Sequence, residues 1–119
     1  MVKLKDLPLL RLKPVSQFGS TTLKEVVGNE DTEIVVWRVR CPHCKTLMGL
    51  LEQENHDKMI SINIDDQVNR AIRNKVEEWT SMTHYHIVSD DKQKLLEAFG
   101  ITHVPFTEKV TVDLFENDF

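Results

Sequence analysis

The chain has few cysteines and no long apolar run, and each shortage excludes a class of protein. Its 119 residues contain two cysteines, too few for a scaffold held by several disulfide bonds. No apolar run approaches the roughly 20 residues that a helix needs to cross a bilayer, so we expect no membrane segment. The N-terminal stretch MVKLKDLPLLRLK places charges between its leucines and lacks the unbroken apolar block of a secretory signal. We therefore expect a cytoplasmic protein, or a periplasmic (extracytoplasmic) one if a targeting segment has been removed from the sequence.

The chain also lacks an excess of basic residues. It has 15 Lys and Arg against 19 Asp and Glu, a net charge of -4, whereas a nucleic-acid-binding domain usually has a concentrated basic face. We expect no nucleic-acid partner. With 40% apolar and 29% charged residues, the composition is typical of a folded domain, and the length suits one core. We predict a single domain over residues 1–119 and expect a monomer.

Two kinds of apolar pattern alternate along the sequence. Alternating or consecutive apolar residues predict strands, which we place as a pair within 2–15, at 33–39, 59–64 and 84–88, and in a last segment around 110–114. Apolar residues at i, i+3 and i+4 predict helices, which we place at 22–27, 42–54, 66–79 and 91–99. Strands that alternate with helices indicate an α/β fold with parallel strand pairs and helices on both faces of the sheet.

Residues at the expected helix ends support these assignments. Thr22 and Glu25 match the capping box, in which a hydroxyl caps the helix and a glutamate follows three residues later. Pro42 suits the first helical position, because the N–H that it lacks would have been unpaired there. Asp and Ser often cap helices, so we expect caps for the later helices at 65–66 and 89–91.

The two cysteines lie where a buried strand is expected to meet a helix. An apolar run at 34–39 leads into Cys41-Pro42-His43-Cys44. A disulfide across so short a loop stabilises a fold little, because the entropic gain shrinks with the loop. A dithiol in this position is typical of a redox site. Unpaired N–H groups and the helix dipole stabilise an anion at a helix N-terminus, so we expect Cys41 to be the nucleophile and Cys44 the buried thiol.

Two other uses of the cysteines stay open. The side chains could be buried small hydrophobic groups without chemistry. Cys41 and Cys44 could also bind zinc with His84 and His86, which share one face of an expected strand and complete a Cys2His2 set. If they do not bind metal, we expect the two histidines to form a strand face that is partly exposed to solvent.

Two motifs resemble the thioredoxin-like family. VVWRVRCPHC, followed by a Leu- and Met-rich helix, is similar to the family's apolar strand, aromatic residue (here Trp37) and C-P-x-C. GITHVP at 100–105 resembles the family segment whose cis proline, here Pro105, faces the dithiol. The N-terminal strand pair and the additional helix and strand at 66–88 resemble the TlpA/ResA-like branch, which is related to peroxiredoxins. The resemblance covers about 8–115 and implies a thioredoxin-like fold, a central mixed sheet flanked by helices.

The resemblance implies a thiol-disulfide oxidoreductase that exchanges disulfides with protein or small-molecule thiols. Cys41 would attack and Cys44 would resolve the mixed disulfide, so the Cys41–Cys44 disulfide is the redox group and we expect no cofactor. We also expect no metal, because a cis proline over the dithiol opposes the zinc alternative. Arg40 and His43, on either side of the Cys41-Pro42 pair, would stabilise the thiolate. A stabilised reduced form predicts a couple more oxidising than thioredoxin.

The cis proline predicts a substrate-binding segment. Pro105, if cis, presents the Val104 backbone to a bound peptide, which can pair with it like a strand. His103 should lie near the dithiol, either as a substrate contact or as a plain loop residue.

The sequence departs from the family pattern at several positions. Val35 stands where thioredoxin has a buried acid, and Leu47 where ResA-like proteins have a glutamate, so neither familiar proton-relay carboxylate is present. Arg40 replaces a common tryptophan, and the final strand and C-terminal helix of the family look missing or reduced. These departures support an alternative, a non-catalytic thioredoxin-like binding or adaptor module. A peroxidase is less favoured, because peroxiredoxins use Thr-x-x-Cys and Cys41 takes the threonine position.

Overall fold

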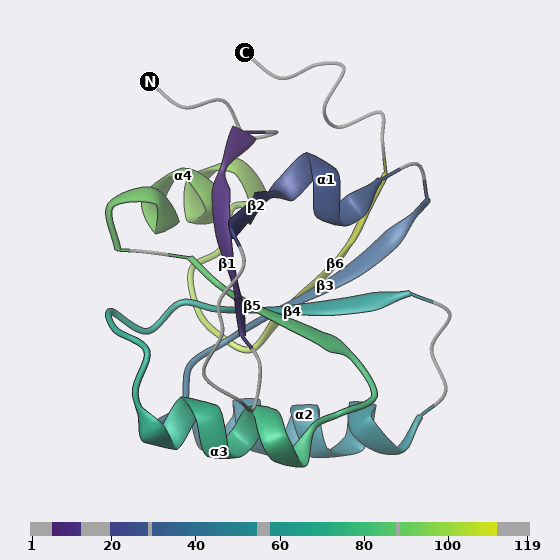
Figure 1. The fold of residues 1–119 in the computed structure, drawn as a ribbon, viewed down its shortest axis with the longest axis vertical. Helices are drawn as coiled ribbons and strands as arrows, with labels where there is room; N and C mark the ends of the chain where they lie inside the picture. Colours follow the sequence, from purple (N-terminus) through teal and green to yellow (C-terminus); the bar gives the residue numbers. More distant parts are fainter. Residues whose placement is uncertain (1–5, 13–19, 29, 55–57, 88, 112–119) are drawn as a thin grey trace.

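The computed structural model describes residues 6–12, 20–28, 30–54, 58–87 and 89–111. The strands in these ranges are β1 (Pro8–Leu12), β2 (Ser20–Thr22), β3 (Thr32–Trp37), β4 (Met59–Asn63), β5 (Thr83–His86) and β6 (Phe106–Val110). The helices are α1 (Leu23–Val27), α2 (Pro42–Gln53), α3 (Arg70–Glu78) and α4 (Ser89–Phe99) (Figure 1). Across these residues, no helix has the length and apolar character required to cross a membrane.

The six described strands form one mixed sheet in the order β2-β1-β5-β4-β3-β6. The three central strands β5, β4 and β3 are parallel to one another. The strands β1, β2 and β6 pair antiparallel with their neighbours. This arrangement confirms the predicted α/β fold with a central mixed sheet and an inserted helix and strand, here α3 and β5. An N-terminal strand pair is also present, but its second strand, β2, lies outside the predicted range of 2–15.

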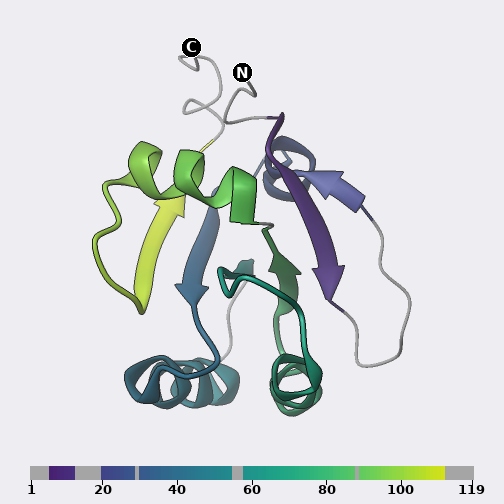
Figure 2. The ribbon, with the colours of Figure 1, turned by 90° about the vertical axis from the view of Figure 1, so that its left-hand side faces the viewer.

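Helices cover both faces of the sheet. Figures 1 and 2 show α2 and α3 together on one face, and α1 and α4 on the other. Strand β3 is buried on both faces, as its consecutive apolar residues predict: Ile34 and Val36 pack on the α1/α4 side, and Val35 and Trp37 on the α2/α3 side. The α2/α3 core, defined as the buried apolar residues between these two helices and the sheet, includes Trp37, Val39, Cys44, Met48, Leu51, Ile72, Val76 and Trp79.

Local residues account for the start of α1 and for the ends of α1 and α4. The Thr22 hydroxyl accepts a hydrogen bond from the Glu25 N–H and caps α1, as the capping-box pattern predicts. Gly28 and Gly100 follow the two helices with φ of 64°, a left-handed conformation that glycine adopts without steric cost. The predicted cap at 89–91 is instead the first turn of α4, which begins at Ser89.

The start of the third helix was predicted wrongly. The helix α3 begins at Arg70 instead of residue 66, and the side chain of Asn69 caps it by accepting a hydrogen bond from the Ile72 N–H at 3.0 Å. Asp65 and Asp66 serve other partners. Asp65 accepts the Val39 N–H, and Asp66 forms an ion pair with Lys92. An aspartate pair before an apolar helical pattern therefore did not mark the cap.

The histidines of β5 were also predicted wrongly, because both are buried instead of partly exposed. His84 is 3% and His86 is 2% exposed. In the register of the parallel pair, His84 lies opposite Ser61 and His86 opposite Asn63, both of them buried polar residues of β4. Each histidine forms a hydrogen bond with the residue opposite it. Polar partners in register make burial of these rings tolerable.

The N-terminal strand β1 does not alternate strictly between buried and exposed side chains. In β1, Leu9 and Leu12 are buried and Leu10 is half-buried, so the strand contributes to the cores on both faces. The last strand was predicted too late in the sequence, around 110–114, because β6 runs over Phe106–Val110. Residues 112–114 of that prediction lie outside the described residues.

Candidate active site: the Cys41–Cys44 dithiol

The two cysteines lie between the end of β3 and the first turn of α2. Cys41 is the N-cap of α2, and Pro42 occupies the first helical turn. The Cys41 sulfur accepts a hydrogen bond from the Cys44 N–H at 3.1 Å, which satisfies one of the unpaired donors at the helix start. Cys41 is half-buried and Cys44 is fully buried in the α2/α3 core, and both are free thiols. The local sequence therefore gives one accessible and one inaccessible sulfur.

A second segment, far away in the sequence, approaches the same sulfur. The Cys41 thiol lies 3.8 Å from the Val104 carbonyl oxygen, to which it donates a hydrogen bond. The peptide bond between Val104 and Pro105 is cis, as the second motif predicts. Pairing of β6 with β3 holds this segment beside the start of α2, because Phe106 lies opposite Val36. The structure thus brings together the two predicted motifs.

The environment of Cys44 disfavours its thiolate. Burial away from water raises the pKa of Cys44 to about 12, and the hydrogen bond with Cys41 and the negative charges of Cys41 and Asp65 act in the same direction. A backbone hydrogen bond involving Arg38 opposes this effect. At neutral pH the Cys44 sulfur therefore carries a proton, and the two sulfurs are chemically different.

The other predicted site residues are arranged around Cys41 in different ways. Arg40, Pro42 and His43 are exposed neighbours of Cys41 in the chain. His103 is exposed, and its Nδ1 lies 3.1 Å from the Thr102 hydroxyl. His103 and Val104 both line a cavity of about 130 Å³. The structure thus places Val104 at the sulfur and His103 along the adjacent cavity.

Two residues of this region were not found from the sequence. Arg38 lines the cavity with His103 and also a neighbouring cavity of about 250 Å³ that Asp65, Asp66 and Lys92 line. Asp65 accepts the Val39 N–H at 2.8 Å and so contacts the turn that leads to the cysteines. Its position directly after a central parallel strand was the available signal, because functional residues gather at the carboxyl ends of such strands.

The histidines of the zinc alternative are held by other partners. The Nδ1 of His84 is hydrogen-bonded to the Ser61 hydroxyl and its Nε2 to the Trp79 carbonyl oxygen. The Trp37 indole N–H donates to the same Ser61 oxygen at 3.2 Å. Within the described ranges, no group of three or more His, Cys, Asp or Glu side chains is placed to hold a metal ion. The Cys2His2 set is therefore not assembled by this fold.

The architecture and the site define a class of protein, the thioredoxin-like fold with a C-x-x-C pair at the start of a helix. No protein-family model and no curated protein sequence matches the chain. Solved structures do match it. One is the thioredoxin domain of a thiol-disulfide oxidoreductase from Bacteroides vulgatus, with a TM-score of 0.65 and 15% identity over 93% of this chain and 82% of that one.

Two further solved structures give the same result. A thiol:disulfide interchange protein from Bacteroides sp. has a TM-score of 0.67 and 16% identity over 93% of this chain and 76% of that one. The MTB protein DsbF, solved in mixed oxidized and reduced forms, has a TM-score of 0.64 and 16% identity over 90% and 84%. The likeness confirms the predicted thioredoxin-like fold.

Proposed function

We propose that this protein is a thiol-disulfide oxidoreductase that exchanges disulfides with protein or small-molecule thiols through Cys41 and Cys44. The observation that carries the proposal is the asymmetry of the dithiol. The half-buried Cys41 sulfur faces a helix N–H and the Val104 carbonyl, and the Cys44 sulfur beneath it is inaccessible. The solved structures described above, whose names include thiol-disulfide oxidoreductases, support the same activity.

The reaction proceeds in two exchanges. The Cys41 thiolate attacks one sulfur of a partner disulfide, a Cys41–partner bond forms, and the other partner sulfur leaves as a thiolate. Cys44 then loses its proton to solvent and attacks the Cys41 sulfur. The Cys41–Cys44 bond forms and the second partner thiolate leaves, so two electrons pass from the dithiol to the partner. Run in reverse, the same steps oxidise a partner dithiol.

The two cysteines set the rates of different steps. The Cys44 N–H donates to the Cys41 sulfur, a bond that strengthens when the sulfur is negative, and this favours the attacking thiolate. We assign Arg40, exposed beside Cys41, the role of adding positive charge near that sulfur, and the exposed His43 the role of a hydrogen-bond donor to it. Burial, the largest cause that raises the pKa of Cys44, also acts in the mixed disulfide and keeps the Cys44 thiolate scarce at neutral pH. We therefore expect the second exchange to be the slower one.

In this proposal, the backbone at Val104 binds the partner peptide. The Val104 carbonyl lies beside Cys41, and an extended peptide that carries a disulfide can pair with this segment as a further strand. The cavity lined by Arg38, His103 and Val104 continues from it and accommodates a neighbouring side chain of the partner. The cysteine pair is itself the redox group, so the proposed reaction needs no cofactor. One copy of the chain suffices, because Cys41, Cys44 and Val104 belong to it.

Turnover of insulin and of glutathione disulfide tests the proposal. The wild-type protein should reduce both substrates, Cys41→Ser should be inactive, and Cys44→Ser should accumulate a covalent mixed disulfide that mass spectrometry identifies. Equilibration with glutathione gives the reduction potential, which decides whether a reducing cytoplasm or an oxidising compartment suits the dithiol. A folded wild-type protein without turnover would instead support the non-catalytic adaptor alternative.

A further inference from the structure

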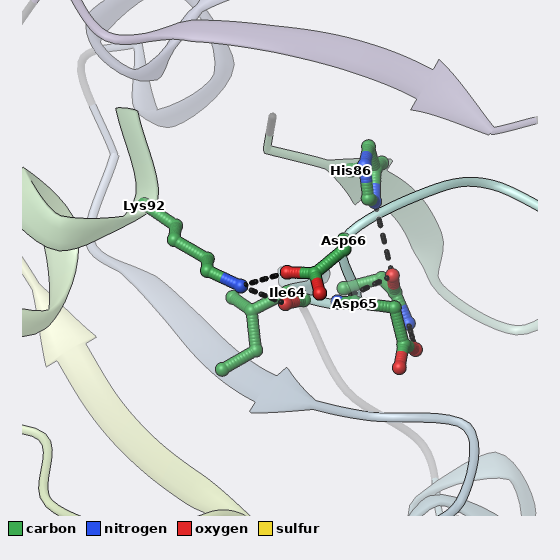
Figure 3. Close-up of polar contacts among 6 residues, drawn as sticks. Ile64, Asp65, Asp66, His86 and Lys92 are labelled. Atoms are coloured by element: carbon green, nitrogen blue, oxygen red, sulfur yellow. Dashed lines mark hydrogen bonds and ion pairs between the residues drawn. The ribbon is translucent and has the colours of Figure 1, made fainter. Parts of the chain in front are cut away.

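A chain of hydrogen bonds connects β5 to the turn that carries the dithiol. His86 is bonded through Nδ1 to the Asn63 side-chain oxygen at 3.0 Å, and the Asn63 amide nitrogen donates to an Asp65 carboxylate oxygen at 2.8 Å (Figure 3). The same carboxylate oxygen accepts the Val39 N–H at 2.8 Å. His86 and Asn63 are buried and Asp65 is half-buried. This series of hydrogen bonds therefore ends at the Val39 N–H, two residues before Cys41.

The backbone N–H of Asp65 determines which groups donate and which accept in this series of hydrogen bonds. The Asp65 N–H donates to the Asn63 oxygen at 3.1 Å, so this atom of the amide is the acceptor. It follows that His86 donates from Nδ1 and that the Asn63 NH2 group points at the Asp65 carboxylate. The carboxylate accepts two N–H groups, one from the Asn63 side chain of β4 and one from Val39 in the turn before α2. These two bonds hold the Asp65 carboxylate in one orientation.

The turn that Asp65 holds is the one that positions Cys41. The Cys41 N–H donates to the Arg38 carbonyl at 3.4 Å across this turn, and Val39, between them, is buried in the same core as Cys44. We propose that Asp65 is a positioning residue of the dithiol, which fixes the turn from β3 to α2 and acts on the buried Cys44 through its charge. This inference rests on the proposed function, but the tests below separate the two.

The charge of Asp65 bears on the second exchange. Burial and the bond with Cys41 are the main causes that raise the pKa of Cys44, and the Asp65 charge adds to them. The other charged or titratable groups in this region are Arg38 in the turn, Lys92 of α4, the adjacent Asp66, and His86 of β5. Lys92 bonds to Asp66 at 2.6 Å and to the Ile64 carbonyl at 3.3 Å, as Figure 3 shows. Its closest carboxylate partner is therefore Asp66.

Asp65 and a proton-relay carboxylate have opposite effects on the rate of the second exchange. A relay carboxylate removes the Cys44 proton, so its loss slows the second exchange. A fixed negative charge disfavours the Cys44 thiolate, so its loss accelerates that exchange. Val35 and Leu47, the positions of the familiar relay carboxylates, are apolar, and Asp65 reaches the site from the end of β4 instead.

The experiment compares Asp65→Asn with Asp66→Asn. Both substitutions remove one negative charge at adjacent positions, but Asp66 is exposed and paired with Lys92. Asparagine keeps an oxygen that can accept the Val39 N–H, so the turn is retained. The reduced proteins are mixed with Ellman's reagent, where the first release of thionitrobenzoate reports attack by Cys41 and the second reports resolution by Cys44.

We expect Asp65→Asn to accelerate the second release about two- to fourfold, since a higher thiolate fraction is partly offset by lower nucleophilicity. Asp66→Asn should match the wild type. An Asp65→Asn variant that is slower than the wild type, or equal to Asp66→Asn, would overturn the inference.

A second readout does not depend on turnover. Titration of ¹³C-labelled cysteines by NMR should show a lower pKa for Cys44 in Asp65→Asn than in the wild type or Asp66→Asn, even if the protein exchanges no disulfide. Asp65→Ala, which also removes the acceptor of the Val39 N–H, should lower Tm by several degrees more than Asp65→Asn does. Equal Tm values for these two variants would refute the proposed hold on the turn.

Discussion

The buried thiol of Cys44 makes the stability of the reduced protein depend on alkaline pH. Its pKa is raised from 9.0 to about 12 in the folded protein, chiefly by burial. Between these values the unfolded chain has lost this proton and the folded protein retains it, so the free energy of unfolding falls as the pH rises. Each pH unit costs about 1.4 kcal/mol. The loss is about 2 kcal/mol at about pH 10.5 and at most about 4 kcal/mol above pH 12.

Cys44→Ala isolates this contribution. Urea unfolding under reducing conditions at about pH 7, 9 and 10.5 gives the free energy of unfolding of both proteins. Other titrating groups act equally in both, so the wild type should lose about 2 kcal/mol more than Cys44→Ala between about pH 7 and about pH 10.5. The oxidised wild type, in which the Cys44 thiol is absent, should follow the alanine variant. Parallel curves for the reduced wild type and Cys44→Ala would refute the account.

Three further predictions concern residues away from the dithiol. Burial would raise the pKa of Glu52, but hydrogen bonds from Ser81 and its neighbour lower it. Because solvent screens this group, Glu52→Gln should cost only about 0.5–1 kcal/mol at neutral pH, and urea unfolding should show the difference shrinking below pH 4.5. Burial lowers the pKa of His84 below 6.5, so its contribution to the free energy of unfolding is present above that pH and is lost as the pH falls. Between about pH 7.5 and about pH 5, the free energy of unfolding of the wild type should therefore fall more than that of His84→Gln. An equal fall would contradict the lowered pKa. Gly49 lies inside α2 with open space for a Cβ, so Gly49→Ala should raise the free energy of unfolding by about 0.5–1 kcal/mol. Gly100 has a φ of 64°, so Gly100→Ala should lower the free energy of unfolding by about 1 kcal/mol. Thermal melts in which Gly100→Ala is more stable than Gly49→Ala would refute this prediction.

Local patterns were enough to predict the active-site segments. The apolar run before Cys41 forms β3, and the i, i+3, i+4 spacing after it forms α2, because each pattern depends on a single element and its own faces. The proline motif was also correctly predicted to lie beside the dithiol, because the Cys41 thiol donates a hydrogen bond to the Val104 carbonyl. Which roles the site residues have in catalysis stays a prediction until the cysteine variants are measured.

Two of the failures involve pairs of residues from different elements. The burial of His84 depends on Ser61 lying opposite it in β4, and strand register is invisible in a single strand's pattern. Asp65 was predicted to cap a helix because its local context suits a cap, but its carboxylate instead accepts the Val39 N–H from the turn before α2. Asn69, a good cap residue four positions later, then starts α3.

The contact between Cys41 and Val104 spans 63 residues, more than half of the chain. It exists only after β6, the last of the described strands, has paired with β3. Contacts of such sequence separation form late, because the loop between them must close first. Until then the Cys41 sulfur lacks the Val104 carbonyl beside it, whereas the core that buries Cys44 is built from residues that precede β6. During synthesis, Cys44 can therefore be buried before Cys41 gains the contact with the proline segment.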